Sequence, residues 1–461
     1  MLSSRLPKDL SPSPFFAELE CVKAEVLAEC AVADGRVGNA GGLPFIDLTV
    51  SSPVKAGLPI DLNAAVDEGR EAFGCWNPDA AGWKSAREAV VEYYRERGGN
   101  FTAGQIILTA STSEAYSVLF KTFCDPGDVI LTPMPGYPLL DTLAQLEHLE
   151  CAPYFLKLRR EKRKGVILEG SQNPIESIDP IGTKSLQGDK RDCFRFVLDS
   201  DSLFASPERA KILLLVSPHN PTGHCISRGE WNETVRFCEE NNLILVVDEV
   251  FGDYGFSPEV RRSWEYLMGG KREPRLRGDD SGREPLWDAG GGDFINLPEN
   301  GPKCPIFWLN GLSKAVGSPQ LKLGWMAFHA PRERFEEIRA ALEFVEDAYL
   351  SVSAPAQALG MALLPKATAY EARVKERLLQ NWQTLREAFP SKYCPEVLGG
   401  WYAVVRLGED DEEITLRLLR EKHVLVQPGF FFDFDEDGWV VVSLLQEPAT
   451  FKEAVDRMVN R

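Results

Sequence analysis

The feature that most constrains this chain is a regular alternation of strand-like and helix-like segments. From about residue 61 to 156, helical stretches such as SAREAVVEYYRERGG alternate with short apolar runs such as QIILTA and VILTPMP. The alternation resumes with AKILLLV, a helix from about 228 to 241, and LILVVDEVF. Parallel strands joined by helices give this pattern, and continuously apolar strands are typical of a sheet covered on both faces. The sequence therefore predicts an α/β fold with a mostly parallel central sheet.

Length and two polar segments set the expected domain organisation. At 461 residues the chain is longer than one ordinary core requires. Segments at about 158–192 and 257–303 are polar and lack a sustained period, so we expect surface excursions there. The last part of the chain alternates differently and predicts a separate α+β lobe. The predicted divisions are an N-terminal arm with part of the small domain at 1–60, a large domain at 61–330 and a C-terminal small α+β domain at 331–461.

Composition excludes several classes of partner. The chain has 51 Lys and Arg against 69 Asp and Glu, a net charge of −18, which disfavours nucleic acids and anionic membranes but leaves open a local basic pocket for a small anion. The N-terminus (MLSSRLPKDLSPSPFF) has no continuous apolar stretch, so we expect a cytoplasmic protein. The 10 cysteines are scattered without C-x-x-C spacing, which favours free thiols over a disulfide framework or a metal site.

Three predicted strands end in residues that carry chemistry. Asn220 opens Asn-Pro-Thr-Gly after the first strand, Asp248 ends the second, and Lys314 lies in the turn after IFWLNGL. In an open α/β sheet the ligand crevice lies outside the carboxyl ends of the strands, so these side chains are expected to meet. Taken singly, Asn-Pro-Thr-Gly is also a common turn, and Asp248 could be a helix N-cap or part of a structural ion pair. A lysine whose pKa is depressed forms Schiff bases.

The ordered set of Tyr137 in MPGYP, Asn220-Pro-Thr-Gly, Asp248 and Ser313-Lys314 resembles the class I and II aminotransferases, which are fold-type I pyridoxal-phosphate enzymes. The resemblance covers nearly the whole chain apart from the two excursions. It implies a large domain with a mostly parallel seven-stranded sheet flanked by helices, and a smaller α+β domain. It also implies pyridoxal 5'-phosphate as the cofactor and a homodimer with its sites at the interface.

By this resemblance Lys314 forms a Schiff base with the cofactor and later moves a proton at the substrate. Asp248 would keep the pyridine nitrogen protonated, so that the ring can accept electrons. Asn220 would donate to the phenolic oxygen, and Tyr137 would stack on the ring without adding charge.

The phosphate group needs a site of its own, and LTASTSEAYSVLF offers one. Ser111, Thr112 and Ser113 lead into a helix whose N–H groups and dipole favour a dianion, although an ordinary N-cap has the same geometry. Lys322 occupies the position where the family usually has an arginine facing the phosphate. A lysine supplies the charge without the planar bidentate fork, and a solvated surface lysine is the alternative reading.

Two departures from the family pattern concern the cofactor. Phe251 stands where the family usually has a tyrosine that donates to the phenolic oxygen, and losing that donor should raise the pKa of the Schiff base. The Tyr254 hydroxyl could donate to the phenolic oxygen instead. However, Tyr254 lies beyond the end of the strand, where its side chain is not expected to point in the same direction as that of Phe251. Trp76 replaces a tyrosine that, in family dimers, reaches the partner subunit's phosphate; its indole N–H can donate one hydrogen bond.

The third departure concerns the substrate. If Ser443 in VVVSLL is the serine of the family's Arg-apolar-Ser strand, Val441 replaces the arginine that binds the substrate carboxylate. Valine cannot form that bidentate pair, so either another cation takes over or the substrate presents something other than a free α-carboxylate. Arg406, on the same strand face as Tyr402, is a candidate substitute with Tyr402 beside it, and a surface arginine closing the strand is the alternative.

The leading hypothesis is a pyridoxal-phosphate aminotransferase that moves an amino group from an amino acid or amine to a 2-oxo acid by a ping-pong mechanism. A pyridoxal-phosphate lyase or decarboxylase acting on an amino acid derivative stays open, because the missing arginine affects which Cα bond lies perpendicular to the ring. A non-catalytic pyridoxal-phosphate sensor is a third hypothesis, and the presence of Lys314, Asp248 and Asn220 argues against it.

Overall fold

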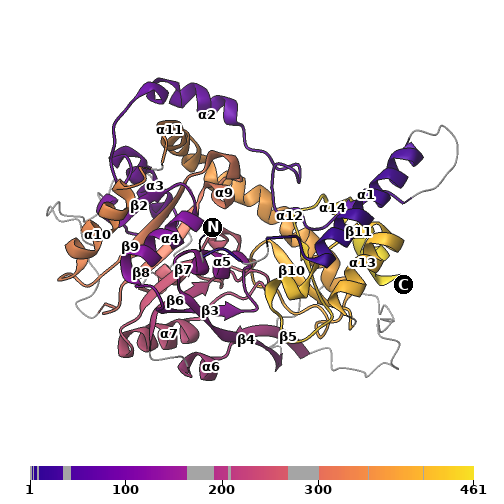
Figure 1. Ribbon diagram of the computed structural model, residues 1–461. Helices are drawn as coiled ribbons and strands as arrows, with labels where there is room; N and C mark the ends of the chain where they lie inside the picture. Colours follow the sequence, from indigo (N-terminus) through magenta and orange to yellow (C-terminus); the bar gives the residue numbers. More distant parts are fainter. Residues whose placement is uncertain are drawn as a thin grey trace, which may run out of the picture.

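A computed structural model gives the structure of the chain and describes residues 3, 5–7, 10–34, 43–162, 192–205, 209–267, 301–350, 352–408 and 410–460. Its largest feature is an eight-stranded sheet with the order β2-β9-β8-β7-β6-β3-β4-β5 (Figure 1). The neighbours from β8 through β4 pair in parallel, whereas β2–β9, β9–β8 and β4–β5 are antiparallel. The predicted α/β fold with a mostly parallel sheet is confirmed. The strands are β2 (Ile106–Thr109), β3 (Val129–Met134), β4 (Glu150–Lys162), β5 (Asp192–Leu198), β6 (Ala210–Val216), β7 (Ile244–Asp248), β8 (Ile306–Gly311) and β9 (Gly324–His329).

Helices cover both faces of this sheet. Because successive strand residues point to opposite faces, Ile212 and Leu214 of β6 join one hydrophobic cluster and Leu213 and Leu215 join the other. The first cluster includes buried residues of α4 (Thr112–Phe123), α5 (Leu139–Leu146) and α10 (Phe335–Asp347). The second includes those of α3 (Lys84–Arg95) and α7 (Arg228–Glu240). This two-sided burial explains why the central strands are apolar throughout.

The resemblance implies a seven-stranded sheet, but the sheet has eight strands, with β5 at one edge, and this edge also corrects a second prediction. The segment at about 158–192 was expected to be a surface excursion, but residues 158–162 continue β4 and pair with β5 in an antiparallel hairpin, from Leu158↔Phe196 to Lys162↔Asp192. A hairpin at a sheet edge can carry polar side chains along its length, so its sequence lacks the apolar run of a central strand. Residues 163–191 lie outside the described part. Of the second expected excursion, 257–303, the described part contains α8 (Ser263–Leu267), and residues 268–300 lie outside it.

A second, smaller sheet lies toward the C-terminus. Its order is β10-β13-β12, all antiparallel, with β10 (Tyr402–Arg406), β12 (Gln427–Pro428) and β13 (Trp439–Ser443). The first long helix, α1 (Pro14–Asp34), packs through Phe15, Leu19, Val22 and Val26 against α13 (Asp411–Lys422), far along the chain (Figure 1). Strand β1 (Ile46–Asp47) likewise pairs in parallel with β11 (Val424–Leu425). The N-terminal arm thus packs on C-terminal elements.

The remaining elements are 3₁₀ turns and further helices, several of which contribute buried residues to the core. The described part contains no helix that is both long enough and apolar enough to cross a membrane. All 10 cysteines are free thiols. The remaining helices are α2 (Leu62–Gly69), α6 (Ser200–Phe204), α9 (Leu312–Ala315), α11 (Ala354–Leu363), α12 (Ala367–Ala388) and α14 (Pro448–Val459), and the 3₁₀ turns are η1 (Arg70–Gly74), η2 (Ala103–Gln105), η3 (Gly252–Tyr254), η4 (Pro319–Leu321), η5 (Leu364–Lys366) and η6 (Gly429–Phe432).

Candidate active site

A cavity of about 440 Å³ opens at the carboxyl ends of the central strands. It is bounded by the end of β7, the loops after β6 and β8, the beginning of α4 and residues from the small sheet. The structure brings to it most of the residues that the sequence predicted. Those that line it are Ser111, Thr112, Ser113, Tyr137, Asn220, Asp248, Lys314, Lys322 and Tyr402.

Asp248 is the last residue of β7 and is buried at the floor of the cavity. One carboxylate oxygen accepts a hydrogen bond from the Tyr116 hydroxyl at 2.8 Å, and the other accepts one from the Val250 backbone N–H at 3.0 Å. Burial raises the pKa of Asp248, while the Val250 and Tyr116 hydrogen bonds and the charge of Lys314 oppose that rise. A carboxylate held in this way can accept a further hydrogen bond from a protonated ring nitrogen.

Lys314 lies on α9, directly after β8, with its side chain half-buried in the cavity. Its Nζ is 4.9 Å from the centre of the Trp401 ring and 5.5 Å from that of Phe251. Burial lowers the pKa of Lys314 to about 8, although the nearby charge of Asp248 acts in the opposite direction. Near neutral pH this amine is therefore uncharged far more often than an ordinary lysine, and the uncharged amine is the state that attacks a carbonyl.

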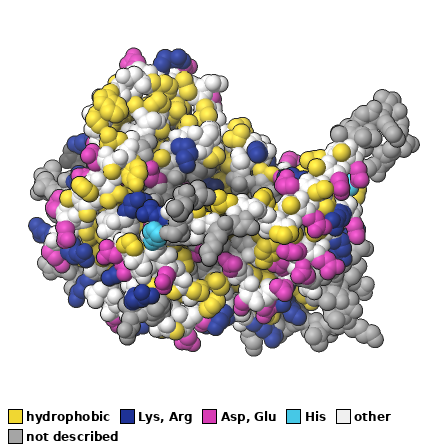
Figure 2. Space-filling model, in the orientation of Figure 1, with side chains coloured by type: hydrophobic (Ala, Val, Ile, Leu, Met, Phe, Trp, Pro, Cys, Tyr) yellow, Lys and Arg dark blue, Asp and Glu magenta, His cyan; other side chains and the backbone are white. Residues whose placement is uncertain are grey.

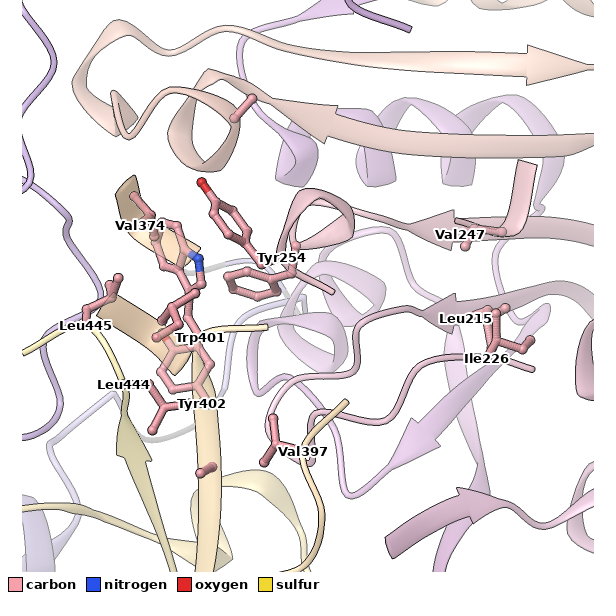
Figure 3. Close-up of a cluster of buried hydrophobic side chains, with 14 of the residues drawn as sticks. Leu215, Ile226, Val247, Tyr254, Val374, Val397, Trp401, Tyr402, Leu444 and Leu445 are labelled. Carbon is pink, nitrogen blue, oxygen red and sulfur yellow. The ribbon is translucent and has the colours of Figure 1, made fainter. Parts of the chain in front are cut away.

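Tyr254 holds the backbone at Lys314 and does not line the cavity. Its hydroxyl donates a hydrogen bond to the Lys314 carbonyl at 2.7 Å, and its ring packs 5.2 Å from that of Trp401 (Figure 3). The structure therefore does not support Tyr254 as a substitute donor to the cofactor. Phe251, at the position of the family's tyrosine, is buried and lines the cavity with a ring that carries no hydroxyl.

The beginning of α4 forms the other end of the cavity. Ser111 is the N-cap and accepts a hydrogen bond from the Glu114 N–H at 3.2 Å, and Thr112 and Ser113 follow on the first turn. A Cβ at Gly324 would lie 3.0 Å from the carbonyl carbon of Ser111, so a glycine there lets β9 approach the helix N-terminus. Lys322, exposed and in the left-handed region (φ 51°), lines the cavity just before this contact. Three hydroxyl-bearing residues, a helix N-terminus and a lysine suit a phosphate dianion.

Asn220 and Tyr137 complete the set that matches the cofactor. The Asn220 Oδ1 atom is buried without a hydrogen-bond partner in the described part of the chain, so the side-chain amide has capacity for a ligand in the cavity. Burial raises the pKa of Tyr137, and the negative charge of Asp248 raises it further. An orphaned amide, a buried carboxylate, an amine and an anion site around one cavity fit pyridoxal 5'-phosphate.

Two predicted residues are not part of this cavity. Trp76 is 82% exposed and lines a second, smaller hollow. Arg406 forms an ion pair with Glu436, and its guanidinium lies 5.7 Å from the Trp439 ring centre. Because Arg406 is absent from the cavity lining, we do not propose it further as a substrate-binding residue. Its position matches the surface arginine that the sequence left open.

Val441 is fully buried in β13, paired with Val404 on one side and with Gln427 on the other. Gln427, Ser51 and Tyr402 line the cavity beside the small sheet. Sequence reasoning missed Ser51 and Gln427, and it also missed Tyr116 on α4. Only the position of Tyr116, within the predicted phosphate-binding helix, could have indicated it.

Comparison with known proteins places this chain in a family. The model of the family described as "Aminotransferase class I and II" matches residues 62–458. The glutamate-pyruvate aminotransferase AlaA of Haemophilus influenzae is 22% identical over 436 residues, covering 91% of each chain. The tyrosine aminotransferase of Mus musculus is 24% identical, covering 87% of this chain and 77% of its own. A solved alanine aminotransferase from Pyrococcus furiosus superposes with a TM-score of 0.68 at 21% identity, covering 98% of this chain and all of its own, and shares the fold.

These relatives are aminotransferases, so the comparisons do not support the lyase or decarboxylase alternative. With a family model that spans both the central sheet and the small sheet, the chain belongs to the class I and II aminotransferases, the pyridoxal-phosphate-dependent transaminases of fold type I.

Proposed function

We propose that this aminotransferase transfers an amino group from an amino acid or amine to a 2-oxo acid by a ping-pong mechanism in which Lys314 is the reactive amine. The observation that carries the proposal is the pairing of Lys314, whose pKa burial lowers to about 8, with the buried carboxylate of Asp248 at one cavity. Both half-reactions would use the same cavity and the same lysine.

Pyridoxal 5'-phosphate, when bound, supplies an aldehyde for the amine and a ring that accepts electrons from the substrate Cα. Asp248 is positioned to hold a proton at the ring nitrogen, and Tyr116 and the Val250 N–H keep its carboxylate oriented. Ser111 and Lys322 are placed to bind the phosphate group. Lys314 can then carry a proton to and from the substrate carbon, because its lowered pKa makes both protonation states accessible.

Absorbance spectroscopy of the purified protein tests the lysine assignment. The protein with cofactor should show the near-visible band of a protonated Schiff base, and Lys314→Ala should lose it. Lys322→Ala is the matched control, since it removes a cavity lysine that we assign to the phosphate: the band should persist at saturating cofactor. A persistent band in Lys314→Ala would refute the assignment.

A screen of amino donors tests the reaction. Conversion of the cofactor to its amine form by an amino acid or amine, and its reversal by a 2-oxo acid, is the expected result. Release of carbon dioxide or pyruvate without that conversion would instead favour the lyase or decarboxylase chemistry.

We further propose that the protein works as a cytoplasmic homodimer, with the divisions at 1–60, 61–330 and 331–461 as its arm, large domain and small domain. Large hydrophobic side chains are exposed around the second hollow and on α10: Trp76 is 82% exposed, Phe344 81%, Tyr349 54% and Leu350 40%. Hydrophobic side chains also gather at the top of the molecule, over α2 and α11 (Figure 2). Such exposed surface favours association, and it leaves Trp76 free to reach a partner subunit. Sedimentation as a fully active monomer would contradict this proposal.

A further inference from the structure

The cavity has one side with no charged residue. Ser51 from the arm, Tyr402 from β10 and Gln427 from β12 line it beside the small sheet. They offer a carboxamide and two hydroxyl groups, those of Ser51 and Tyr402, which interact with each other. The Gln427 side chain is half-buried and makes no hydrogen bond to any described residue, so its amide is available to a ligand.

Under the proposed function, the cations that line the cavity have roles other than binding a substrate carboxylate. Within the described lining they are Lys314, the reactive amine, and Lys322, which lies beside the beginning of α4. The nearest candidate on the small sheet, Arg406, is paired with Glu436 outside the cavity. Beside Gln427 on the neighbouring strand β13, the fully buried Val441 carries only an apolar side chain.

This lining discriminates against a free carboxylate. A carboxylate that leaves water for a partly enclosed site loses hydration that uncharged donors replace incompletely, and a guanidinium or ammonium group usually compensates for that loss. A neutral group such as a carboxamide or hydroxyl loses much less hydration. Its donors and acceptors can also form hydrogen bonds with the hydroxyl and amide groups of the lining.

We propose that the preferred amino donor carries an uncharged hydrogen-bonding group, a carboxamide or a hydroxymethyl group, where an α-amino acid carries its carboxylate. The proposal rests on the aminotransferase function given above and names the donor class for the same site. In the net reaction the donor R–CH(NH₂)–X becomes R–CO–X while the carbonyl group of the acceptor becomes the corresponding primary amine. The C–N bond of the donor is replaced by C=O and the reverse occurs in the acceptor, so atoms and electrons balance without a further reactant.

Matched donors test this directly. The protein with bound cofactor is mixed with L-alanine, L-alaninamide or L-alaninol, and with the corresponding phenylalanine series, and the rate constant of conversion to the amine form is followed by absorbance. Rates are compared per concentration of unprotonated amine, because the three amines differ in acidity. We expect the rate constant for the amide or the alcohol to exceed that for the acid by about tenfold or more. A factor of this size corresponds to the loss of one hydrogen bond to a charged group. An acid that reacts as fast as its neutral analogues overturns the inference, whereas a complete absence of conversion by all donors overturns the proposed function itself.

Gln427 variants provide an independent measurement. Gln427→Lys places a cation at a half-buried position and should shift the acid-to-amide rate ratio toward the acid by about tenfold. Gln427→Met has similar size and no charge, so it should slow the neutral donors and leave the acid no faster. If Gln427→Lys and Gln427→Met give the same ratio, the uncharged side of the cavity does not select the donor.

Discussion

The two sides of the cavity differ in how they are built. The cofactor side comes from the ends of parallel strands and the helix that follows β2, with Asp248 and Lys314 held by hydrogen bonds from Tyr116 and Tyr254. The substrate side comes from the arm and the small sheet, where Val441 is apolar and the Gln427 side chain has no hydrogen-bond partner among the described residues. The residues expected for pyridoxal phosphate are together on the first side, while the expected arginine is missing on the second. We therefore expect the chemistry and the choice of substrate to depend on separate parts of the fold.

Asp248→Asn should produce the largest loss on the cofactor side. The amide keeps the shape of the side chain but removes the charge that stabilises a protonated ring nitrogen, so kcat should fall roughly 10²–10³-fold. Tyr402→Phe, which removes one neutral donor on the substrate side, should change kcat only severalfold. Steady-state kinetics at saturating cofactor measures both variants. A larger loss in Tyr402→Phe than in Asp248→Asn would reverse the assignment of the two sides.

Lys322 should affect cofactor binding more than the chemical step. Lys322→Ala removes the cation beside the α4 N-terminus and should raise the cofactor's Kd about tenfold, the size of one charged hydrogen bond. Lys322→Arg should retain or improve affinity, because a guanidinium can bind a phosphate through two parallel hydrogen bonds. Titration of cofactor into cofactor-free protein gives both values. Equal Kd values for the alanine and arginine variants would mean that Lys322 is a solvated surface lysine.

The lowered pKa of Lys314 predicts a pH dependence of stability in the cofactor-free protein. Between the folded pKa of about 8 and the ordinary value of 10.5, the unfolded chain holds a proton that the folded chain has released. The free energy of unfolding should therefore rise with pH across this window, and the full penalty of burying the charge should be present below it. Lys314→Met cannot titrate, so the difference in stability between wild type and variant should change with pH only in that window. A constant difference from pH 7 to about 11 would contradict the lowered pKa.

The sequence could predict the cofactor side because its key residues lie beside strongly apolar strands. Asp248 and Lys314 follow runs such as LILVV and IFWL, whose burial fixes where each strand ends. Ser51 and Gln427 could not be predicted in this way, because they come from distant parts of the chain and meet only after the arm packs on C-terminal elements. The β4–β5 hairpin was missed for another reason: an edge hairpin needs no continuous apolar run.

The smallest expected effect separates positioning of Lys314 from general stability. Tyr254→Phe removes the hydrogen bond to the Lys314 carbonyl and should cost about 0.5–1.5 kcal/mol of stability. Tyr154→Phe is the matched control, since its buried hydroxyl also donates to a backbone carbonyl at 2.7 Å, that of Leu214, away from the cavity lining. Both variants should lose similar stability in urea denaturation. Only Tyr254→Phe should lower kcat severalfold and shift the pH profile of kcat, because only Tyr254 holds the backbone that positions the reactive amine. Equal kinetic effects in the two variants would assign Tyr254 a purely structural role and leave Trp401 and Phe251 as the contacts that position the lysine.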